Sequence, residues 1–243
     1  MKIQAPGFKP AGDSALMVYW DAPVTPELNR YITRLKYSLV QAGIVGITDI
    51  VPAYATLLVY YDPAVTGYSL LCGEISGLLA GGDGLRPVMQ SNKTVVIPVF
   101  YGRDYGPDLD YIAGEKGLTP GEVIGIHSRA RYYVYMIGFL PGFPYLGFVD
   151  QRIAMGRRGE PRSLVPAGSV GIAGRQTGIY SLASPGGWQI IGRTPVRLFK
   201  PEKKEFLLSV GDRVIFRPVE DGVSFADLDP DAWGELCGTG EGD

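Results

Sequence analysis

Only one side chain in this sequence, the imidazole of His127, has an ordinary pKa near neutral pH. Histidine is the usual general acid or base, so His127 is a candidate catalytic residue. It also falls in the last turn of a helix predicted after the capping box of Thr119 and Glu122, with Pro120 at the first helical position. A histidine there often binds only the terminal carbonyl groups of its helix. A substrate-site role and a structural role both stay open.

Other catalytic patterns are weak or absent in the sequence. Ser169 lies in AGSVG, but Ala167 stands where a G-x-S-x-G elbow has its first glycine, and no helix is predicted to follow. No G-x-x-x-x-G-K-[ST], G-x-G-x-x-G or H-E-x-x-H motif occurs. One histidine and two distant cysteines, Cys72 and Cys237, argue against a metal site and a disulfide framework. We therefore expect a reducing, cytoplasmic setting.

Residues 138–195 are unusually rich in glycine, proline and aromatic residues. Glycine permits close backbone approach and proline ends helices, while the aromatic and branched side chains indicate burial. The block therefore predicts tight turns between short buried strands. Its spacing Gly168-x-x-Gly171-x-x-Gly174 could present backbone N–H groups to an anion, although such glycines more often let a barrel turn its corners.

The same region is strongly basic. Residues 151–200 hold eight Lys and Arg residues and one acid, Glu160, which gives a net charge of +7 in a chain whose net charge is −2. A local positive field suits a carboxylate or a phosphate, whereas scattered, solvated arginines are the alternative interpretation. With one carboxylate in the block, a demanding reaction would need a partner protein. The side chains that could bind an anion, together with backbone amides, are Arg162, Gln176, Tyr180 and Arg193.

Residues 1–90 predict a small α+β domain. The apolar run 14–20 predicts a strand, Thr25-Pro26 begins a helix and Gly43 ends it. Strands at 44–51 and 55–61 and a second helix at 68–79 follow, and this β-α-β-β-α order is most of a ferredoxin-like split βαβ unit. Residues 81–87 are typical of a linker or of a loop before an edge strand. The apolar face of the first helix consists of Leu28, Ile32, Leu35 and Leu39.

Residues 91–220 predict a mainly-β domain. Strands are expected at 94–101, 132–137, 188–191, 196–199, 206–208 and 214–219, with short helices beginning at Gly106-Pro107-Asp108-Leu109 and at Thr119. Many short strands with turn signals between them favour a closed or nearly closed barrel. Residues 221–243 are acidic, with no basic residue after Arg217. They predict a solvated, partly disordered tail, or one that docks on the arginine-rich barrel or on a partner.

The sequence gives no sign of a membrane or nucleic-acid partner. It contains no apolar run of about 20 residues, the length that a spanning helix needs, and its first residues lack the apolar core of a secretory signal. The slightly negative net charge and the lack of a basic–aromatic platform argue against nucleic-acid binding.

Three long motifs in the barrel region resemble a known family. GFLPGFPYLG, PRSLVPAGSVGIAGRQTGIY and SPGGWQIIGRTP are similar to the family of the 5-oxoprolinase (pyroglutamase) B subunit, also called allophanate hydrolase subunit one. This family includes the Kip inhibitor of a sporulation histidine kinase. YATLLVYYDP, YGPDLDYIA and the helix that ends at His127 extend the resemblance over residues 12–218. Ser181 departs from it, because family members usually have proline there, and the shape of that turn stays open.

The resemblance implies a ferredoxin-like α+β domain followed by a cyclophilin-like β-barrel. It also implies a non-autonomous component of an ATP-dependent 5-oxoprolinase, which hydrolyses 5-oxo-L-proline to L-glutamate with a homologous C subunit and a separate A subunit. Whether ATP binds this chain stays open. The alternatives are an inhibitor of a sensor histidine kinase and a component of a related urea-carboxylate (allophanate) amide hydrolase. A prolyl isomerase is not implied, since a shared barrel does not transfer catalysis.

The resemblance also implies a ligand groove on the barrel. Our hypothesis is that Arg162 and Arg193 hold the anion, and that His127 or Tyr180 acts as the catalytic residue by hydrogen-bonding the lactam or a phosphorylated intermediate. Phe139, Phe143 and Trp188 would exclude water from the site. The family positions expected near the groove are His127, Phe139, Phe143, Arg162, Gln176 and Tyr180.

Overall fold

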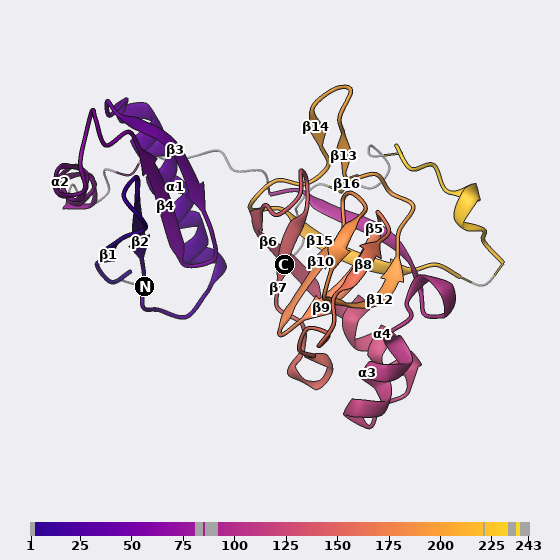
Figure 1. The fold of residues 1–243 in the computed structure, drawn as a ribbon. Helices are drawn as coiled ribbons and strands as arrows, with labels where there is room; N and C mark the ends of the chain where they lie inside the picture. Colours follow the sequence, from indigo (N-terminus) through magenta and orange to yellow (C-terminus); the bar gives the residue numbers. More distant parts are fainter. Residues whose placement is uncertain (1–2, 81–84, 86–91, 221, 233–236, 239–243) are drawn as a thin grey trace. The chain divides into compact units, whose positions relative to one another are not determined.

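The computed structural model describes residues 3–80, 85, 92–220, 222–232 and 237–238. The chain forms two compact units, Met1–Gln90 and Ser91–Asp243 (Figure 1). Each unit buries its own hydrophobic core. Within the described ranges, no helix combines the length and the apolar character needed to cross a membrane.

The N-terminal unit is an antiparallel sheet with two helices on one face. Its elements are β1 (Gly7–Pro10), β2 (Ala15–Tyr19), α1 (Pro26–Ala42), β3 (Ile47–Pro52), β4 (Thr56–Tyr61) and α2 (Tyr68–Ala80). The strand order is β1-β2-β4-β3. Inward-facing residues of the strands, such as Leu16, Val18 and Val59, are fully buried in one cluster with the helices. Tyr60, which alternates with Val59, is exposed, as expected for a sheet covered on one face.

Helix α1 begins and ends at the predicted residues. The Thr25 hydroxyl accepts a hydrogen bond from the backbone N–H of Leu28 at 3.2 Å, and Gly43 ends the helix in the left-handed region with φ of 59°. All four residues of the predicted apolar face are at most 1% exposed. Local capping signals and apolar spacing were therefore sufficient to predict this helix.

The sheet contains the predicted split βαβ arrangement. Helix α1 connects β2 to β3, and β4 lies between these two strands and is antiparallel to both. The fourth strand, however, is β1, which precedes the unit in sequence and was not predicted. The expected linker or edge-strand loop at 81–87 falls, apart from residue 85, outside the described residues. The ferredoxin-like assignment stays a prediction.

The second unit is built on a barrel, as predicted, and the barrel is closed by seven strands. In order around the barrel, each strand pairs with the next, and the last pairs with the first. Among the described strands, only β5 and β15 pair in parallel. The likeness to cyclophilin stays a prediction. The order is β12 (Gln189–Arg193), β9 (Ser169–Ala173), β10 (Gln176–Ile179), β7 (Pro144–Gly147), β6 (Arg131–Ile137), β15 (Arg213–Pro218) and β5 (Thr94–Tyr101).

Helices α3 (Leu109–Lys116) and α4 (Pro120–Arg129) lie at one end of the barrel, and the hairpin of β13 (Phe199–Lys200) and β14 (Glu205–Phe206) extends from the other (Figure 1). The predicted capping box of α4 is present. The hairpin is shorter than the two strands predicted there, because neighbouring apolar residues such as Leu198 and Leu207 turn into the core. The remaining elements are β8 (Arg162–Val165), β11 (Ser184–Gly186), β16 (Cys237–Gly238) and the short helices η2 (Arg103–Tyr105), η3 (Gln151–Ile153) and η4 (Phe225–Asp227).

The barrel interior is filled with apolar side chains. Val95, Ile97 and Val99 alternate along β5 and are completely buried, and they pack with Ile172 and Phe216 from other strands. An interior packed in this way leaves no channel for a ligand. A binding site on this unit must therefore lie on the outside of the barrel or at its ends.

The described part of the acidic tail contacts the barrel. The Phe225 ring stacks on that of Tyr105, with centroids 5.1 Å apart, and the Arg193 guanidinium lies 5.1 Å from the Phe225 ring centroid. The Asp231 carboxylate pairs with Lys200 at 3.4 Å and with Arg197 at 3.7 Å. Of the two predictions for the tail, the contacts of residues 222–232 therefore support docking on the barrel.

Candidate functional site

His127 is completely buried at the C-terminal end of α4. Its Nε2 lies 3.0 Å from the Thr177 hydroxyl, and its Nδ1 lies 2.8 Å from the Tyr101 hydroxyl. The Thr177 hydroxyl donates to the carbonyl oxygen of Gly171 at 3.0 Å, so it accepts from Nε2–H. Nδ1 is then the acceptor for Tyr101. Both ring nitrogens of His127 are thus fully used.

This burial determines the protonation state of His127. Burial lowers the pKa of His127 to about 3, because the charged imidazolium would lose its hydration. The ring stacks on Phe216, with centroids 4.7 Å apart, inside the main core. His127 is therefore neutral and closed to substrate in this structure. Of the two roles that the sequence left open for His127, this geometry supports the structural one, and a catalytic role stays a prediction.

Most of the predicted aromatic wall comes together in a second cluster of the barrel unit. Phe143, Tyr180 and Trp188 are buried there, and the Phe143 ring contacts the other two edge-to-face at centroid distances of 5.3 and 5.5 Å. Phe139 packs its ring edge-on against Phe143 at 5.5 Å but is 61% exposed. Its φ of 68° lies in the left-handed region, which is rare for an aromatic residue. Of the four residues Phe139, Phe143, Tyr180 and Trp188, Phe139 is therefore the one that presents apolar surface to solvent.

Tyr180 is 1% exposed, and its hydroxyl lies beside the backbone of Gly186 and Trp188. Burial raises the pKa of Tyr180, and a backbone hydrogen bond with Trp188 partly offsets this rise. A Cβ atom at Gly186 would lie 2.2 Å from the Tyr180 hydroxyl oxygen, so only glycine fits beside it. A neutral, enclosed phenol cannot act as a base near pH 7. The catalytic role predicted for Tyr180 has no support in this geometry.

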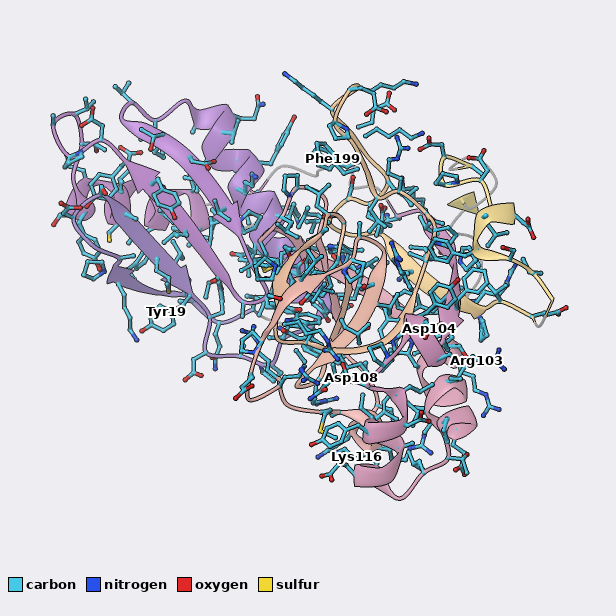
Figure 2. All side chains as sticks on the ribbon, turned by 45° about the vertical axis from the view of Figure 1, so that its right-hand side comes forward. Tyr19, Arg103, Asp104, Asp108, Lys116 and Phe199 are labelled. Carbon is cyan, nitrogen blue, oxygen red and sulfur yellow. The ribbon has the colours of Figure 1, made fainter. Side chains whose placement is uncertain are left out.

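Arg162 does not stand free as an anion clamp but forms an ion pair. Its Nη2 donates to Asp108 Oδ1 at 2.8 Å, and Nη1 of Arg158 donates to the same oxygen at 3.0 Å. Asp108 Oδ2 accepts from the backbone N–H of Ile190 at 2.6 Å. Asp108 is 3% exposed and lies at the barrel end where α3 begins (Figure 2). This buried carboxylate holds two arginines in fixed positions.

A hollow of about 390 Å³ lies beside Tyr105 and the tail, and another of about 430 Å³ lies beside Asp108. The hollow beside Asp108 has the more polar lining, which includes Asp108, Arg157, Arg158 and Gln189. The charge of Arg157 also lowers the pKa of Tyr145 and of Tyr180, which burial raises in both. Arg157 therefore lines the hollow and is also near the rings of Tyr145 and Tyr180. We define the outer site as Asp108, Arg157, Arg158, Arg162 and Gln189.

The other predicted binding residues have different positions. Gln176 begins β10, two residues from Gly178, where a Cβ atom would meet the Phe143 and Trp188 rings at 3.1 Å. Residues two apart in a strand share a face, so Gln176 lies on the aromatic side of that strand. Arg193 donates from Nε to the carbonyl oxygen of Ala167 at 2.8 Å and contacts the tail instead of the outer site.

Gly168 and Gly171 lie where backbone segments approach each other closely, and their positions do not form an anion site. Gly168 has φ of 82°, its N–H donates to the Tyr180 carbonyl, and a Cβ atom there would lie 2.1 Å from the Thr194 carbonyl oxygen. Gly171 pairs with both neighbouring strands inside the barrel wall. These two glycines therefore allow close strand packing, which was the alternative interpretation of their spacing.

Sequence reasoning did not identify Asp108, Arg157, Arg158 or Gln189 as functional residues. Asp108 was noted only as part of a helix start, because its partners are 50, 54 and 82 residues away in sequence. The surplus of arginines in residues 151–200 was the available signal. In the described part of the chain, no group of three His, Cys, Asp or Glu residues could hold a metal ion.

Comparison with known proteins identifies the family. The model of the family "Carboxyltransferase domain, subdomain C and D" matches residues 6–209. This chain belongs to that family. All five residues of the outer site fall within the match, so they lie in the carboxyltransferase subdomain C and D region itself.

Two bacterial proteins are similar to this chain over most of their length. It is 38% identical to the 5-oxoprolinase B subunit of Bacillus subtilis, covering 84% of this chain and 89% of the relative. It is 40% identical to the 5-oxoprolinase B subunit of Escherichia coli O157:H7, covering 87% and 95%. Similarity over nearly the whole length includes both compact units.

Solved structures show the same fold. A conserved uncharacterized protein of Pyrococcus horikoshii is 42% identical with a TM-score of 0.51, over 88% of this chain and 98% of that protein. The urea carboxylase of Kluyveromyces lactis has a TM-score of 0.73 at 20% identity, and the match covers 89% of this chain but 22% of that enzyme. This second likeness concerns the fold alone. The first solved structures matched are also longer chains, of which this chain covers 40%.

Proposed function

We propose that this chain is the B subunit of a 5-oxoprolinase and takes part in the hydrolysis of 5-oxo-L-proline to L-glutamate. The observation that carries the proposal is the identity of 38% and 40% to two proteins named as 5-oxoprolinase B subunits, across 89% and 95% of their lengths. The urea-related relatives are more distant: a putative urea carboxylase of Emericella nidulans is 26% identical, and the match covers 20% of it. We therefore prefer the lactam over a urea-derived substrate.

The geometry of the barrel unit agrees with a protein that binds but does not catalyse alone. The outer site offers three arginines and one buried glutamine, which suit an anionic amide. Its one buried carboxylate, Asp108, is committed to Arg158, Arg162 and a backbone N–H, so it is not available as a base. His127 is enclosed and neutral. We propose that the catalytic base comes from a partner protein, such as the homologous C subunit or the separate A subunit.

We propose that the complex uses ATP, in a cytoplasmic setting that the low cysteine content of the sequence favours. The sequence has no phosphate-binding motif of the P-loop type. We therefore place the nucleotide site in another component of the complex.

The test is glutamate release from 5-oxo-L-proline and ATP, with this chain mixed with candidate A and C subunits and each omitted in turn. We expect activity only when all three are present. Full activity without this chain would refute the proposal. Activity with a urea-derived carboxylate but not with 5-oxo-L-proline would instead identify the chain as a component of a urea-carboxylate (allophanate) amide hydrolase. Absence of both activities, with inhibition of a sensor kinase's autophosphorylation, would favour the regulator.

A further inference from the structure

The loop that carries Arg157 and Arg158 is held in place by hydrogen bonds from both sides. The backbone N–H of Arg158 donates to the carbonyl oxygen of Gly187 at 2.7 Å, and that of Met155 donates to Gly174 at 3.1 Å. The Gln189 side chain donates from Nε2 to the Gly156 carbonyl oxygen at 3.1 Å. The two arginines are therefore presented from a fixed backbone, so little backbone conformational entropy is lost when they bind a ligand.

The charge around the hollow beside Asp108 is positive. Asp108 neutralises one of the three guanidinium groups of Arg157, Arg158 and Arg162, and Glu160, exposed on the same loop, neutralises at most a second. The Arg158 side chain is 36% exposed and that of Arg162 is 24% exposed, so both are partly desolvated. Arg157 is exposed and lines the hollow. A small anion entering the hollow thus meets charged donors that no carboxylate of the chain fully compensates.

Gln189 adds a feature that positive charge alone does not explain. Its side chain is 4% exposed and lines the hollow, and Nε2 is used by Gly156. Its Oε1 is buried and has no hydrogen-bond partner among the described residues. A buried acceptor without a partner costs about 1–3 kcal/mol, so native proteins rarely keep one without a reason. A ligand with an N–H group would satisfy this oxygen.

We propose that this hollow binds a small carboxylic acid that also bears an amide N–H, with Arg157 and Arg158 holding the carboxylate and Gln189 Oε1 accepting from the N–H. The identification of the acid rests on the proposed function, since 5-oxo-L-proline has one carboxylate and one lactam N–H on a five-membered ring. The hollow volume of about 430 Å³ lies in the range of roughly 300–1,000 Å³ typical of small-molecule sites. Asp108 is then a positioning residue, because it reaches the ligand only through the arginines.

The test measures binding to the intact, isolated chain, so it does not depend on catalysis. Titration calorimetry would compare 5-oxo-L-proline with cyclopentanecarboxylate, which lacks the amide, and with 2-pyrrolidinone, which lacks the carboxylate. We expect 5-oxo-L-proline to bind most tightly. Because Gln189 Oε1 is buried, binding must also move its surroundings. We therefore expect the Gln189 side-chain amide signals in ¹⁵N NMR spectra to shift on addition of 5-oxo-L-proline but not of cyclopentanecarboxylate.

Two variants separate the two halves of the proposed site. Arg157→Gln should weaken binding of both carboxylates by roughly tenfold through loss of a charged donor, and leave 2-pyrrolidinone unchanged. Gln189→Met should remove the preference for 5-oxo-L-proline over cyclopentanecarboxylate. Arg217→Gln removes the same charge from the exposed end of β15 and is the matched control. Circular dichroism would establish that each variant is folded.

The result that overturns the site is distinct from the one that overturns the function. Unchanged affinity in Arg157→Gln, or no binding and no Gln189 shift with wild-type chain, refutes the site even if the chain proves essential in the reconstituted complex. Conversely, binding that follows the expected pattern, together with glutamate release that does not need this chain, would keep the site and refute the proposed function.

Discussion

Two groups of polar residues in the barrel unit differ in how completely their hydrogen bonds are satisfied. Around His127, every polar atom of the ring and of Thr177 has a partner within the core, and the group is neutral. Around Asp108, the residues are charged and partly exposed, and buried atoms of Gln189 and Arg162 have no partner among the described residues. The first group therefore stabilises the core of the barrel unit, whereas the second has hydrogen-bonding atoms left over for the ligand that we propose.

This difference shows why residue type is a poor guide to function in this chain. Histidine is the usual catalytic residue, but a completely buried imidazole whose two nitrogens are both hydrogen-bonded within the core cannot exchange protons with a substrate. Glutamine is a weak candidate from sequence, but an unpartnered buried amide oxygen indicates a place for a donor. The following predictions test the comparison, beginning with the largest expected effect.

The His127 group should make the chain sensitive to acid. The pKa of His127 is about 3 when folded and about 6.5 when unfolded, so the unfolded state binds more protons between these values. This contribution to stability is complete above pH 6.5 and falls as the pH is lowered, by about 1.4 kcal/mol per pH unit. Urea unfolding at pH 7 and at pH 4.5 should therefore differ by about 3 kcal/mol from this residue alone.

The matched variant for this prediction is His127→Gln, which keeps a donor and an acceptor but does not titrate. Other carboxylates also affect acid stability, so the informative quantity is the difference in pH dependence between wild type and variant. The variant should lose less stability than wild type between pH 7 and 4.5. Equal losses would mean that His127 is accessible to protons when folded, and would reopen its catalytic role.

Asp108→Asn should produce the next largest effect, because it breaks a buried ion pair with two arginines. We expect a loss of about 2–3 kcal/mol in the free energy of unfolding, somewhat below the usual cost because Arg158 and Arg162 are partly exposed. Asp150→Asn is the control, since Asp150 pairs with Arg152 at the surface, and it should change stability little. Comparable effects of the two substitutions would contradict the special position of Asp108.

The elements that could be predicted from sequence are those determined by neighbouring residues. Thr25 and Gly43 bound α1, and Thr119 and Glu122 form the capping box of α4, because these contacts span only a few residues. The apolar run of β5 was located correctly for the same reason. The closed barrel followed from the number of short strands, although no local signal specified that β5 and β15 pair in parallel.

The site could be predicted only in outline. The excess of arginine in residues 151–200 indicated an anion site, but nothing local showed that Asp108 would lie beside Arg158 and Arg162. The hypothesis of an aromatic wall grouped Phe139, Phe143 and Trp188, whose rings do pack together, yet Phe143 and Trp188 are buried while Phe139 is exposed. Pairing over 50 residues or more depends on the barrel closing, which a sequence pattern does not encode locally.

Tyr180→Phe tests whether the aromatic cluster belongs with the structural group or with the outer site. The substitution removes the hydroxyl that is hydrogen-bonded to the Trp188 backbone, which should cost about 1 kcal/mol of stability. The kcat of the reconstituted complex should stay within about twofold, since an enclosed phenol does not meet substrate. Tyr145→Phe, at a half-buried neighbouring ring, is the control. A hundredfold fall in kcat with unchanged melting temperature would restore the catalytic role of Tyr180.

The smallest effect is expected where the tail docks on the barrel. Phe225 stacks on Tyr105 with an interplanar angle of 11° and also contacts Phe100 and Arg193. A double-mutant cycle of Tyr105→Ala and Phe225→Ala should give a coupling of about 0.5–1 kcal/mol in the free energy of unfolding. Neither substitution should change the affinity of the outer site for 5-oxo-L-proline, because the tail touches none of its residues in the described contacts. A change in that affinity would mean that the tail and the outer site are coupled through Arg193. The outer site could then no longer be treated as a ligand site that is independent of the structural contacts of this barrel.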